Sequence, residues 1–455
     1  MTVSLLWFRR DLRISDHPAL VAAAEAGTSV LPVFVLDPRL LTPERPRARR
    51  LLASVRALAD SLDGRLVVRA GDPVDVIPGL AREVGADTVH VTRETTPFGR
   101  RRDAAVGAAL GRDGRRLIPT GTPYAAEPGL VVTQSGEPYR VFTPFARAWG
   151  AHGSPPPVPP PRRISWFDGD VGPVARAGVP AVDAYGGGAG ELAARQQWID
   201  FLADGRLGRY DHDRDRPDLD ATSRLSIPLK YGEIHPRTIL ADIASHPEDR
   251  TSGAARFVSE LAWREFYADV LWHRPDSAWR DLRPELTHLP YDAGPETDRL
   301  VEAWRQGRTG YPIVDAGMRQ LLAEGWMHNR LRMVTASFLT KDLHVWWPIG
   351  ARHFLDHLLD GDIASNNHGW QWVAGTGTDA APYFRVFSPV RQARRFDPLG
   401  DYVRRWVPEL GHVPGAAVHE PWSQPNGYDH GYPRRVVDHD DERREALARY
   451  RQVRR

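Results

Sequence analysis

The sequence predicts an α/β domain followed by a large all-α domain. Over roughly the first 120 residues, short apolar runs rich in Val and Leu alternate with segments whose apolar residues recur at helical spacing. Such alternation is typical of βαβ units and a parallel sheet. From Glu191 onward the periodicity is helical. We therefore predict a five-stranded, parallel, Rossmann-like sheet in residues 1–125, an interdomain linker in 126–190 and a helical domain in 191–455.

The first half contains the expected strands and crossover helices. Asp16 is expected to cap the first helix, with Pro18 in its first turn. The turn after the first strand contains no glycine, so the G-x-G-x-x-G fingerprint of a standard dinucleotide site is absent. The apolar runs predict strands at 3–8, 29–36, 65–70 and 87–92, and the helical spacing predicts helices at 19–27, 47–62 and 76–85.

The second half begins after a stretch with linker composition. The runs SPPPVPPPRR (154–163) and YGGGAG (185–190) are rich in Pro and Gly, which favours an interdomain connection. The later segments with helical periodicity are 191–202, 253–272, 312–326 and 329–343.

Composition excludes several classes of protein. Hydrophobic residues make up 42% and charged residues 26% of the 455 residues, which is typical of a soluble globular protein. The apolar runs are shorter than the roughly 20 residues of a membrane helix, and no secretory signal is visible, so a cytoplasmic location is expected. The chain has no cysteine, which excludes disulfides, thiolate metal sites and iron–sulfur clusters. Because the net charge is only +2, any DNA-binding surface must be local.

Tryptophan is unusually frequent. The chain has 15 Trp against 14 Phe and 13 Tyr, and most of them follow Trp198. Large rings can simply fill a helical core. Alternatively, they stack on flat ligands or transfer electrons.

Two segments carry candidate chemistry. In TSRLS (222–226), the hydroxyl groups can cap the following helix or contribute to an anion site for a pyrophosphate. The segment 358–389 combines acids, amides and two rings, a density of polar groups that suggests a ligand. If Trp370 and Trp372 are helical, their side chains point about 200° apart, so each can face a different pocket.

These segments resemble the DNA photolyase/cryptochrome family. The resemblance rests on WFRRDLRISDHPAL, YDHDRDRPDLDATSRLS, ELAWREFY, GRTGYPIVDAGMRQLLAEGWMHNRLRM and DGDIASNNHGWQWVAGTGTDAAPYFRVF, and it covers essentially the whole chain. It is strongest with the microbial, class I photolyases for cyclobutane pyrimidine dimers. It implies a helical domain that holds FAD, and a light-dependent carbon–carbon lyase. Excited, reduced, anionic FAD would transfer an electron to a flipped-out dimer, which then splits into two pyrimidines.

The resemblance assigns one group of residues to FAD. The TSRLS segment is expected at the phosphates, and Arg332 is expected to pair with Asp360 beside the isoalloxazine. Asn366 falls at the position facing the reactive ring nitrogen, where plant cryptochromes usually carry Asp. A neutral amide tolerates the anionic reduced flavin, whereas a carboxylate would repel it, which favours repair. The FAD-binding residues implied are Tyr210, Thr222, Ser223, Arg224, Leu225, Ser226, Arg332, Asp360, Gly361, Asp362 and Asn366.

A second group is assigned to damaged DNA. Trp263 and Trp372 are expected to flank the flipped lesion, with Glu260 hydrogen-bonded to the pyrimidine edge. Arginines near SPVRQARRFD (388–397) are expected to contact phosphates without reading the sequence. The substrate and DNA residues implied are Arg214, Glu260, Trp263, Arg264, Asn329, Arg330, Met333, Trp372, Gln392, Arg394 and Arg395.

The resemblance also implies a chain of rings that delivers electrons to the flavin. Trp370 and Trp347 match its first two members. The exposed third tryptophan of the family has no counterpart at its expected place, where Tyr291 stands, so the last member is Tyr291 or another ring such as Trp304 or Trp346. The catalytic residues implied are Glu260, Asn366, Trp370 and Trp347.

Other expectations concern partners and alternatives. Relatives with a folate antenna carry an acid where TTPFGRRRD has Phe98 and Gly99, so we expect 8-hydroxy-5-deazaflavin as second chromophore rather than methenyltetrahydrofolate. We expect damaged DNA as the partner, no metal, no membrane, no obligate protein partner and a monomer. The alternative function is a cryptochrome, a blue-light photoreceptor that signals through a partner. Asn366 and the lesion residues argue against it.

Overall fold

The computed structural model describes residues 2–27, 29–42, 45–161, 163–171, 188–379 and 384–453. Part of the expected linker lies outside these residues. The chain divides into two compact units, which are described separately below. The first comprises Met1–Gly208 and Ser223–Pro275, and the second comprises Arg209–Thr222 and Asp276–Arg455. The domain boundaries drawn from the linker composition stay a prediction.

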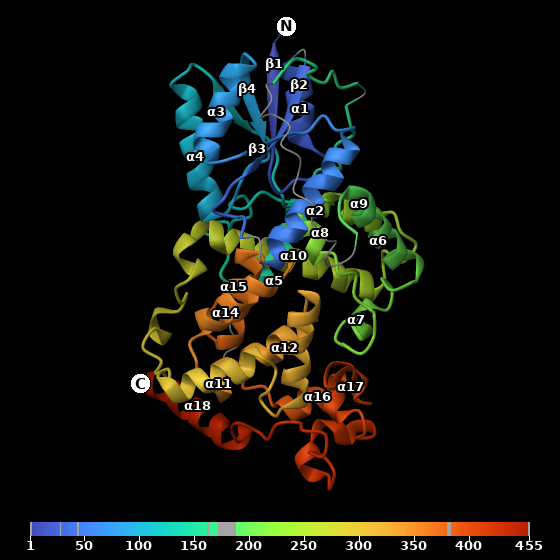
Figure 1. Ribbon diagram of the computed structural model, residues 1–455, viewed down its shortest axis with the longest axis vertical. Coiled ribbons are helices and arrows are strands. Elements are labelled where there is room, and N and C mark those ends of the chain that lie inside the picture. Colours follow the sequence, from blue (N-terminus) through green and yellow to red (C-terminus); the bar gives the residue numbers. More distant parts are fainter. Residues whose placement is uncertain are drawn as a thin grey trace. The chain divides into compact units, whose positions relative to one another are not determined.

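The first unit is built on a parallel sheet of five strands in the order β3-β2-β1-β4-β5 (Figure 1). This confirms the predicted five-stranded parallel sheet. The strands are β1 (Val3–Phe8), β2 (Ser29–Leu36), β3 (Val67–Ala70), β4 (Ala86–Val91) and β5 (Arg116–Pro119). The described residues of β1 are all buried, as expected when helices cover both faces of a parallel sheet.

Helices follow the strands as the alternating pattern predicts. In Figure 1, α3 and α4 lie on one side of the sheet and α1 on the other. The helices of this unit are α1 (Pro18–Ala26), α2 (Pro46–Ser61), α3 (Pro73–Glu83), α4 (Pro97–Gly111), α5 (Phe142–His152), α6 (Glu191–Ala203), α8 (Ser226–Tyr231), α9 (Pro236–Ala244) and α10 (Ser252–His273). Each of α1 to α4 begins with proline, whose fixed φ suits the first helical turn.

The predicted cap of α1 was wrong. His17 is the N-cap, and its side chain accepts a hydrogen bond from the backbone N–H of Leu20. The Asp16 carboxylate instead binds Arg237 at 2.6 Å and Thr238 at 3.1 Å. The local sequence pattern assigns the Asp16 carboxylate to the helix cap. In the folded chain this carboxylate instead binds residues more than 200 positions away.

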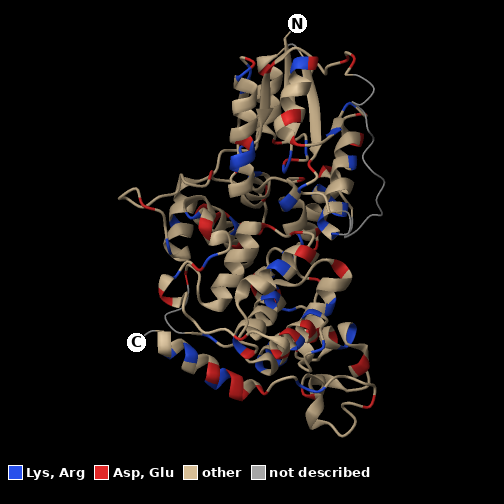
Figure 2. Cartoon of the chain, turned by 60° about the vertical axis from the view of Figure 1, so that its left-hand side comes forward, with Lys and Arg blue, Asp and Glu red and all other residues tan. Residues whose placement is uncertain are grey.

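The second unit is helical, as predicted. Its helices are α7 (Tyr210–Asp213), α11 (Pro295–Arg305), α12 (Pro312–Glu324), α13 (Asn329–Ser337), α14 (Trp347–His357), α15 (Ile363–Ala374), α16 (Pro389–Phe396), α17 (Asp401–Trp406) and α18 (His439–Val453). The segment predicted as one helix over 329–343 changes to a π-helix at Phe338–Asp342, because apolar spacing does not distinguish the two kinds of turn. Charges of both signs alternate along α18 (Figure 2).

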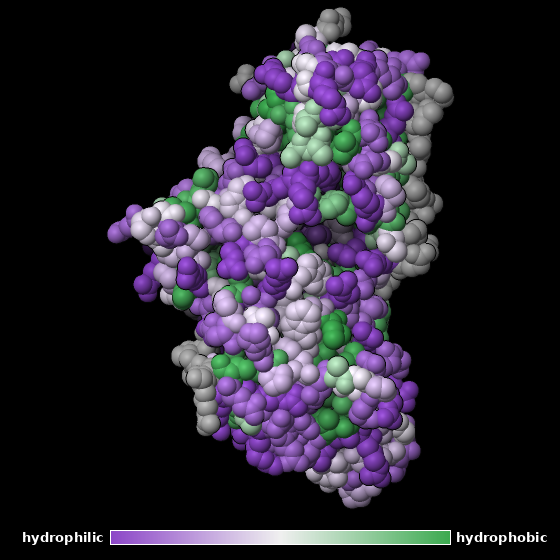
Figure 3. Space-filling view, turned by 90° about the vertical axis from the view of Figure 1, so that its left-hand side faces the viewer, coloured by the Kyte–Doolittle hydropathy of each residue, from purple (hydrophilic) through white to green (hydrophobic). Residues whose placement is uncertain are grey.

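Several tryptophan rings are fully buried in the interior of the two units. Trp7 and Trp198 are buried in the first unit, and Trp304 and Trp347 in the second. On the face drawn in Figure 3, apolar residues form small groups within a mainly hydrophilic surface. In the part of the chain that is described, the helices are too short or too polar to cross a membrane.

Candidate functional site

The TSRLS segment has the backbone of an anion site. Arg224 has φ of 50°, in the left-handed region, and Leu225 follows in the right-handed region with φ of −66°. Backbones that alternate in this way point successive N–H groups toward one point and form a nest for an anion. Leu225 is the N-cap of α8, and no side chain caps that helix. The N-cap residue of α8 therefore supplies no side-chain cap, and the anion-site role of the Thr222 and Ser223 hydroxyls stays a prediction.

The segment is held in place from α6. Gln197 Nε2 donates to the Ser223 carbonyl oxygen at 2.6 Å, and Ser223 Oγ accepts a long hydrogen bond of 3.4 Å from the Leu225 N–H. These contacts fix the turn while a helical core packs beneath it, since Leu225 and Ile227 are buried. Tyr210 and Thr222, assigned to the same phosphates, belong to the second unit.

Arg332 and Asp360 form the predicted ion pair in the second unit. Arg332 Nη1 donates to Asp360 Oδ1 at 3.2 Å, and Nη2 donates to Oδ2 at 2.8 Å. Arg332 Nε also donates to the Met327 carbonyl oxygen at 2.8 Å, so three hydrogen bonds orient the guanidinium plane. The Asp360 side chain is 2% exposed and that of Arg332 25% exposed. The pairing is confirmed, and its place beside an isoalloxazine stays a prediction.

Asp362 and Asn366 lie on the first turns of α15. Asp362 caps the helix by accepting hydrogen bonds from the N–H groups of Ala364 at 3.0 Å and Ser365 at 3.1 Å. Asn366 Nδ2 donates to the Ala351 carbonyl oxygen at 3.1 Å and to Asn367 Oδ1 at 2.8 Å. Because a backbone carbonyl can only accept, the Asn366 amide has a defined orientation. Its Oδ1 is then the atom that can meet a ligand donor.

His328 and Trp370 are among the residues of the second unit with a buried N–H group that has no hydrogen-bond partner among the described residues. His328 Nδ1 accepts from the Arg330 N–H at 3.1 Å, so the proton of the neutral ring is on Nε2, which has no partner. Burial lowers the pKa of His328 to about 4, and the ring is therefore neutral near pH 7. The indole N–H of Trp370 is also unpartnered. A buried donor of this kind costs about 1–3 kcal/mol unless a ligand or water accepts from it.

Each unit has features that fit a part of FAD. In the first unit, the nest suits a pyrophosphate. In the second unit, the Asn366 oxygen and the unpartnered donors suit the polar edges of a flavin. The sequence did not single out His328. A histidine directly before the predicted helix start at Asn329 was the available signal, because histidine can cap a helix through Nδ1.

In the first unit, Trp263 lies on α10 and is stacked on Phe142. The ring centroids are 3.7 Å apart and the planes are 8° from parallel. Tyr267, one turn further along α10, is 5.4 Å from Trp263. Glu260 lies one turn before Trp263, and its Oε1 is 3.5 Å from Arg256 Nε. Phe142 thus supports one face of the ring that is assigned to the lesion. Sequence reasoning missed it because residues 142 and 263 are far apart in the chain.

In the second unit, the structure places the other lesion candidates on two helices. Asn329 is the exposed first residue of α13, and Met333 follows one turn later, partly buried against the core. On α15, Trp370 is 3% exposed, whereas Trp372 is only partly buried. The two rings thus differ in exposure, and the expectation that each faces a different pocket stays a prediction. Their contacts with a lesion stay a prediction.

The arginines assigned to DNA differ in their surroundings. Arg394 is exposed on α16 and pairs with Glu420, and Arg395 is exposed beside it. Arg330 pairs with Asp215 at 2.6 Å within the second unit.

Three other DNA candidates are less exposed. The Arg214 side chain is only 9% exposed. Gln392 is partly buried on α16, and its Oε1 has no partner among the described residues. Arg264 donates to the carbonyl oxygens of Pro123 and Leu229 at 3.2 and 3.4 Å and covers the Tyr124 ring. Arg264 therefore stabilises the first unit, and this environment argues against a phosphate contact.

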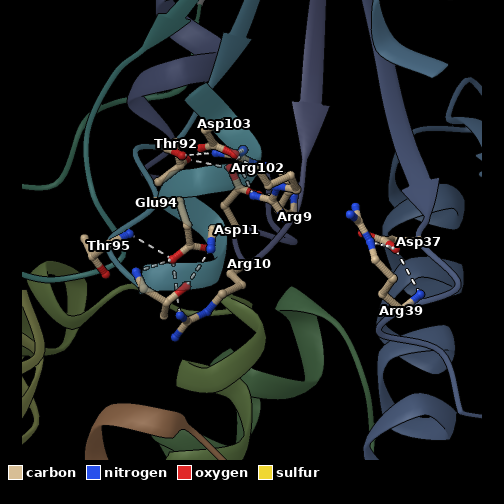
Figure 4. Close-up of polar contacts among 12 residues, drawn as sticks. Arg9, Arg10, Asp11, Asp37, Arg39, Thr92, Glu94, Thr95, Arg102 and Asp103 are labelled. Atoms are coloured by element: carbon tan, nitrogen blue, oxygen red, sulfur yellow. Dashed lines mark hydrogen bonds and ion pairs between the residues drawn. The ribbon is translucent and has the colours of Figure 1, made fainter. Parts of the chain in front are cut away.

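A network of ion pairs and hydrogen bonds lies at the carboxyl edge of the sheet, where β1 and β4 are neighbours (Figure 4). Arg9 Nη1 donates to Asp103 at 2.8 Å, and Thr92 Oγ1 donates to Asp11 at 2.5 Å. Burial raises the pKa of Asp11. The hydrogen bond and charge of His17, together with the charge of Arg9, lower the pKa by more than burial raises it, so the net shift is downward. Ligands of open α/β sheets bind at such a switch point. Here the protein's own side chains neutralise one another at that edge.

Packing at the same edge of the sheet accounts for Gly99, the glycine in TTPFGRRRD. A Cβ at Gly99 would lie 1.7 Å from the Glu94 side chain, so Glu94 can be buried against α4 only if residue 99 is glycine. Burial raises the pKa of Glu94, but the charges of Arg10, Arg102 and Arg9 lower it below its usual value. An acidic side chain at position 99 would therefore have to displace the Glu94 side chain and would meet its negative charge. Among the described residues, no three His, Asp or Glu side chains form a group that could hold a metal ion.

Comparisons with known proteins agree with this geometry. The family described as DNA photolyase matches residues 4–162, and the FAD binding domain of DNA photolyase matches residues 257–452. A deoxyribodipyrimidine photo-lyase of Streptomyces griseus is 41% identical over 472 residues, which cover 100% of this chain and 99% of the relative.

Solved structures share the whole fold. A class III photolyase from Agrobacterium tumefaciens has a TM-score of 0.88 and 35% identity, covering 100% of this chain and 98% of that one. A Synechocystis cryptochrome has a TM-score of 0.89 and 28% identity, covering 100% and 99%. A Sulfolobus tokodaii photolyase with two FAD molecules has a TM-score of 0.82 and 28% identity, covering 99% and 100%.

Fold and site together define an FAD-binding protein with an α/β domain and a helical domain. Relatives of this identity and coverage then decide the family. The chain belongs to the DNA photolyase family.

Proposed function

We propose that this chain is a light-dependent lyase that repairs cyclobutane pyrimidine dimers in DNA. The observation that carries the proposal is the oriented amide of Asn366, in a chain 41% identical to a deoxyribodipyrimidine photo-lyase over its full length. Reduced FAD, when bound and excited by light, supplies the electron that opens the dimer. A neutral amide oxygen can accept a hydrogen bond beside an anionic flavin without charge repulsion.

The residues of the second unit hold the cofactor. Arg332, paired with Asp360, presents a fixed positive charge that stabilises an anionic ring system. Asp362 fixes the start of α15 and with it the place of Asn366. The nest at Arg224 and Leu225, in the first unit, binds the pyrophosphate.

The lesion is bound by aromatic rings. Trp263, supported by Phe142, provides a flat apolar surface on which an unstacked pyrimidine gains about 1–3 kcal/mol. Trp372 provides a second ring, Glu260 accepts from the pyrimidine N–H group, and Asn329 supplies a further polar contact. The exposed arginines of α16 bind phosphates and position the strand.

The test is a repair assay with a single defined dimer. The protein is reduced under anaerobic conditions and mixed with an oligonucleotide that contains one cyclobutane dimer, in blue light and in the dark, and dimer loss is followed by absorbance or chromatography. We expect repair only in light. Absence of repair by fully reduced protein that binds the oligonucleotide would refute the proposal and favour the cryptochrome alternative.

We also propose a second chromophore, with 8-hydroxy-5-deazaflavin favoured over a folate because Phe98 and Gly99 stand where relatives with a folate carry an acid, and a side chain at position 99 would displace Glu94. The absorption spectrum of the purified protein tests this. Flavin bands alone, or two flavins per chain as in the Sulfolobus photolyase with two FAD molecules, would refute the deazaflavin. We expect a cytoplasmic monomer that acts on damaged DNA without an obligate protein partner.

A further inference from the structure

Asp281 in the second unit lies beside two adjacent tryptophans. Trp347 Nε1 donates to Asp281 Oδ1 at 2.7 Å, and the neighbouring Trp346 side chain is close enough to lower the pKa of the same carboxyl. Both rings stand at the start of α14, where Trp346 is the N-cap and Trp347 the first residue. Burial raises the pKa of Asp281, and the hydrogen bond from Trp347 and the nearby Thr376 and Trp346 side chains oppose that rise.

The three rings lead from the candidate flavin site to the surface. Trp370 is one turn after Asn366 on α15 and packs directly on Gly350 of α14, where a Cβ would lie 2.2 Å from the indole. Gly350 is three residues after Trp347 and therefore on the same side of α14. Trp370 is 3% exposed and Trp347 is fully buried, whereas Trp346 is 39% exposed.

The three indoles have different environments, and this difference determines the direction in which a positive charge moves among them. The Trp370 N–H has no partner among the described residues, whereas Trp347 donates to the Asp281 carboxylate and Trp346 lies beside that carboxylate. An indole that loses an electron carries a positive charge, which a hydrogen-bonded carboxylate stabilises strongly in a partly buried site. The positive charge is therefore more stable on Trp347, which donates to the carboxylate, and on Trp346, which is exposed to water beside it, than on the buried Trp370.

The alternative rings are less suitable as the outer member. Trp304 is fully buried and donates to the Thr335 carbonyl oxygen. The Tyr291 hydroxyl is buried and has no partner among the described residues. Oxidation of a phenol releases its proton, so a tyrosine without a hydrogen-bond acceptor is a poor relay. Burial and the Asp281 charge raise the pKa of Tyr291, which also opposes loss of that proton.

We propose that Asp281 is a positioning residue that draws positive charge outward from Trp370 to Trp347 and Trp346, and that Trp346 is the surface end of the electron chain. The inference rests on the proposed function, because photoexcited oxidised FAD is the electron acceptor.

The electrons balance without bond cleavage in the protein. Trp370 gives one electron to the flavin, Trp347 refills Trp370, and Trp346 refills Trp347. The positive charge then remains on Trp346 beside Asp281 until an external thiol returns one electron, and the proton of the oxidised thiol passes to solvent.

The test compares Asp281→Asn with Asp292→Asn in the flavin-loaded, oxidised protein. Asp292 pairs with Arg449 in the same unit and its side chain is 45% exposed, so this control removes an equal charge from a carboxylate that does not hydrogen-bond a tryptophan. We expect the yield of long-lived tryptophan radical after a laser flash to fall about fivefold in Asp281→Asn, since a charged hydrogen bond is replaced by a neutral one, and to stay unchanged in the control. An unchanged yield in both variants would overturn the role of Asp281.

Two further measurements separate a positioning role from a structural one. Trp346→Phe should shorten the radical lifetime and weaken its dependence on added thiol, while an unchanged lifetime would show that Trp346 is not the exit. In the dark, the indole N–H resonance of Trp347 should shift in Asp281→Asn but not in Asp292→Asn, and an unchanged resonance would refute the hydrogen bond.

The repair assay distinguishes an error in the role of Asp281 from an error in the proposed function. Repair by chemically reduced protein does not use the chain of rings, so Asp281→Asn should repair dimers at the wild-type rate. If the wild type does not repair dimers, the proposed function fails whatever the radical yields are.

Discussion

Replacement of Trp263 by leucine should weaken binding to damaged DNA and leave binding to undamaged DNA nearly unchanged. The Trp263 ring is only partly buried, and its one parallel stacking partner among the described residues is Phe142, at 3.7 Å and 8°. A flipped pyrimidine stacked on the ring is worth about 1–3 kcal/mol, which corresponds to about a 5- to 150-fold change in Kd. Phosphate contacts do not depend on the lesion, so they contribute equally to both DNAs.

Two control variants set the scale for the loss of lesion binding. Phe142→Leu removes the ring behind Trp263 and should weaken lesion binding by about 2- to 10-fold, the worth of one aromatic pair of about 0.5–1.5 kcal/mol. Trp272→Leu changes the same residue type on the same helix, where Arg100 covers the ring at 4.0 Å, and should have no lesion-specific effect.

The assay is fluorescence anisotropy with a dimer-containing oligonucleotide and its undamaged twin at one salt concentration, because phosphate contacts are salt-dependent. Thermal unfolding of each variant checks that it is folded. Equal losses on the two DNAs, or a lesion-specific loss in Trp272→Leu as large as in Trp263→Leu, would refute the assignment of Trp263 to the lesion.

Three further predictions follow from other contacts. Asn366→Asp should make the fully reduced anionic flavin harder to accumulate, because a carboxylate replaces a neutral amide; a photoreduction titration identical to wild type would contradict this. Trp347→Phe should slow photoreduction of oxidised flavin and spare repair by pre-reduced protein, at a stability cost of about 1–3 kcal/mol; normal photoreduction would mean that Trp347 only packs. Burial, opposed by Arg264, raises the pKa of Glu265 to about 7, so native protein binds a proton that unfolded protein releases above about pH 4.5. The contribution of Glu265 to stability should therefore fall on the order of 3 kcal/mol as the pH rises from 4.5 through 7. Denaturant unfolding at several pH values should show Glu265→Gln gaining stability relative to wild type over this range, and parallel pH profiles of the two proteins would contradict the prediction.

The sequence by itself determined the order and type of most elements. Apolar runs such as 3–8 and 29–36 become strands because every side chain in them is apolar or small and suits a sheet covered on both faces. Helical periodicity marked α6, α10 and α12. The motifs also led to Arg332, Asp360 and Asn366, because their residue types and spacing match a known family.

Tertiary structure decided which side chains meet. The Asp16 carboxylate binds Arg237 rather than the first turn of α1. Phe142 supports Trp263 from α5, and Asp281 joins Trp347 across 66 positions of sequence. A local pattern reports which face of an element is apolar, since that follows from spacing along one chain segment. The partner of a buried polar group depends on segments that become neighbours only when the whole chain is packed, so these contacts were not predictable from local spacing.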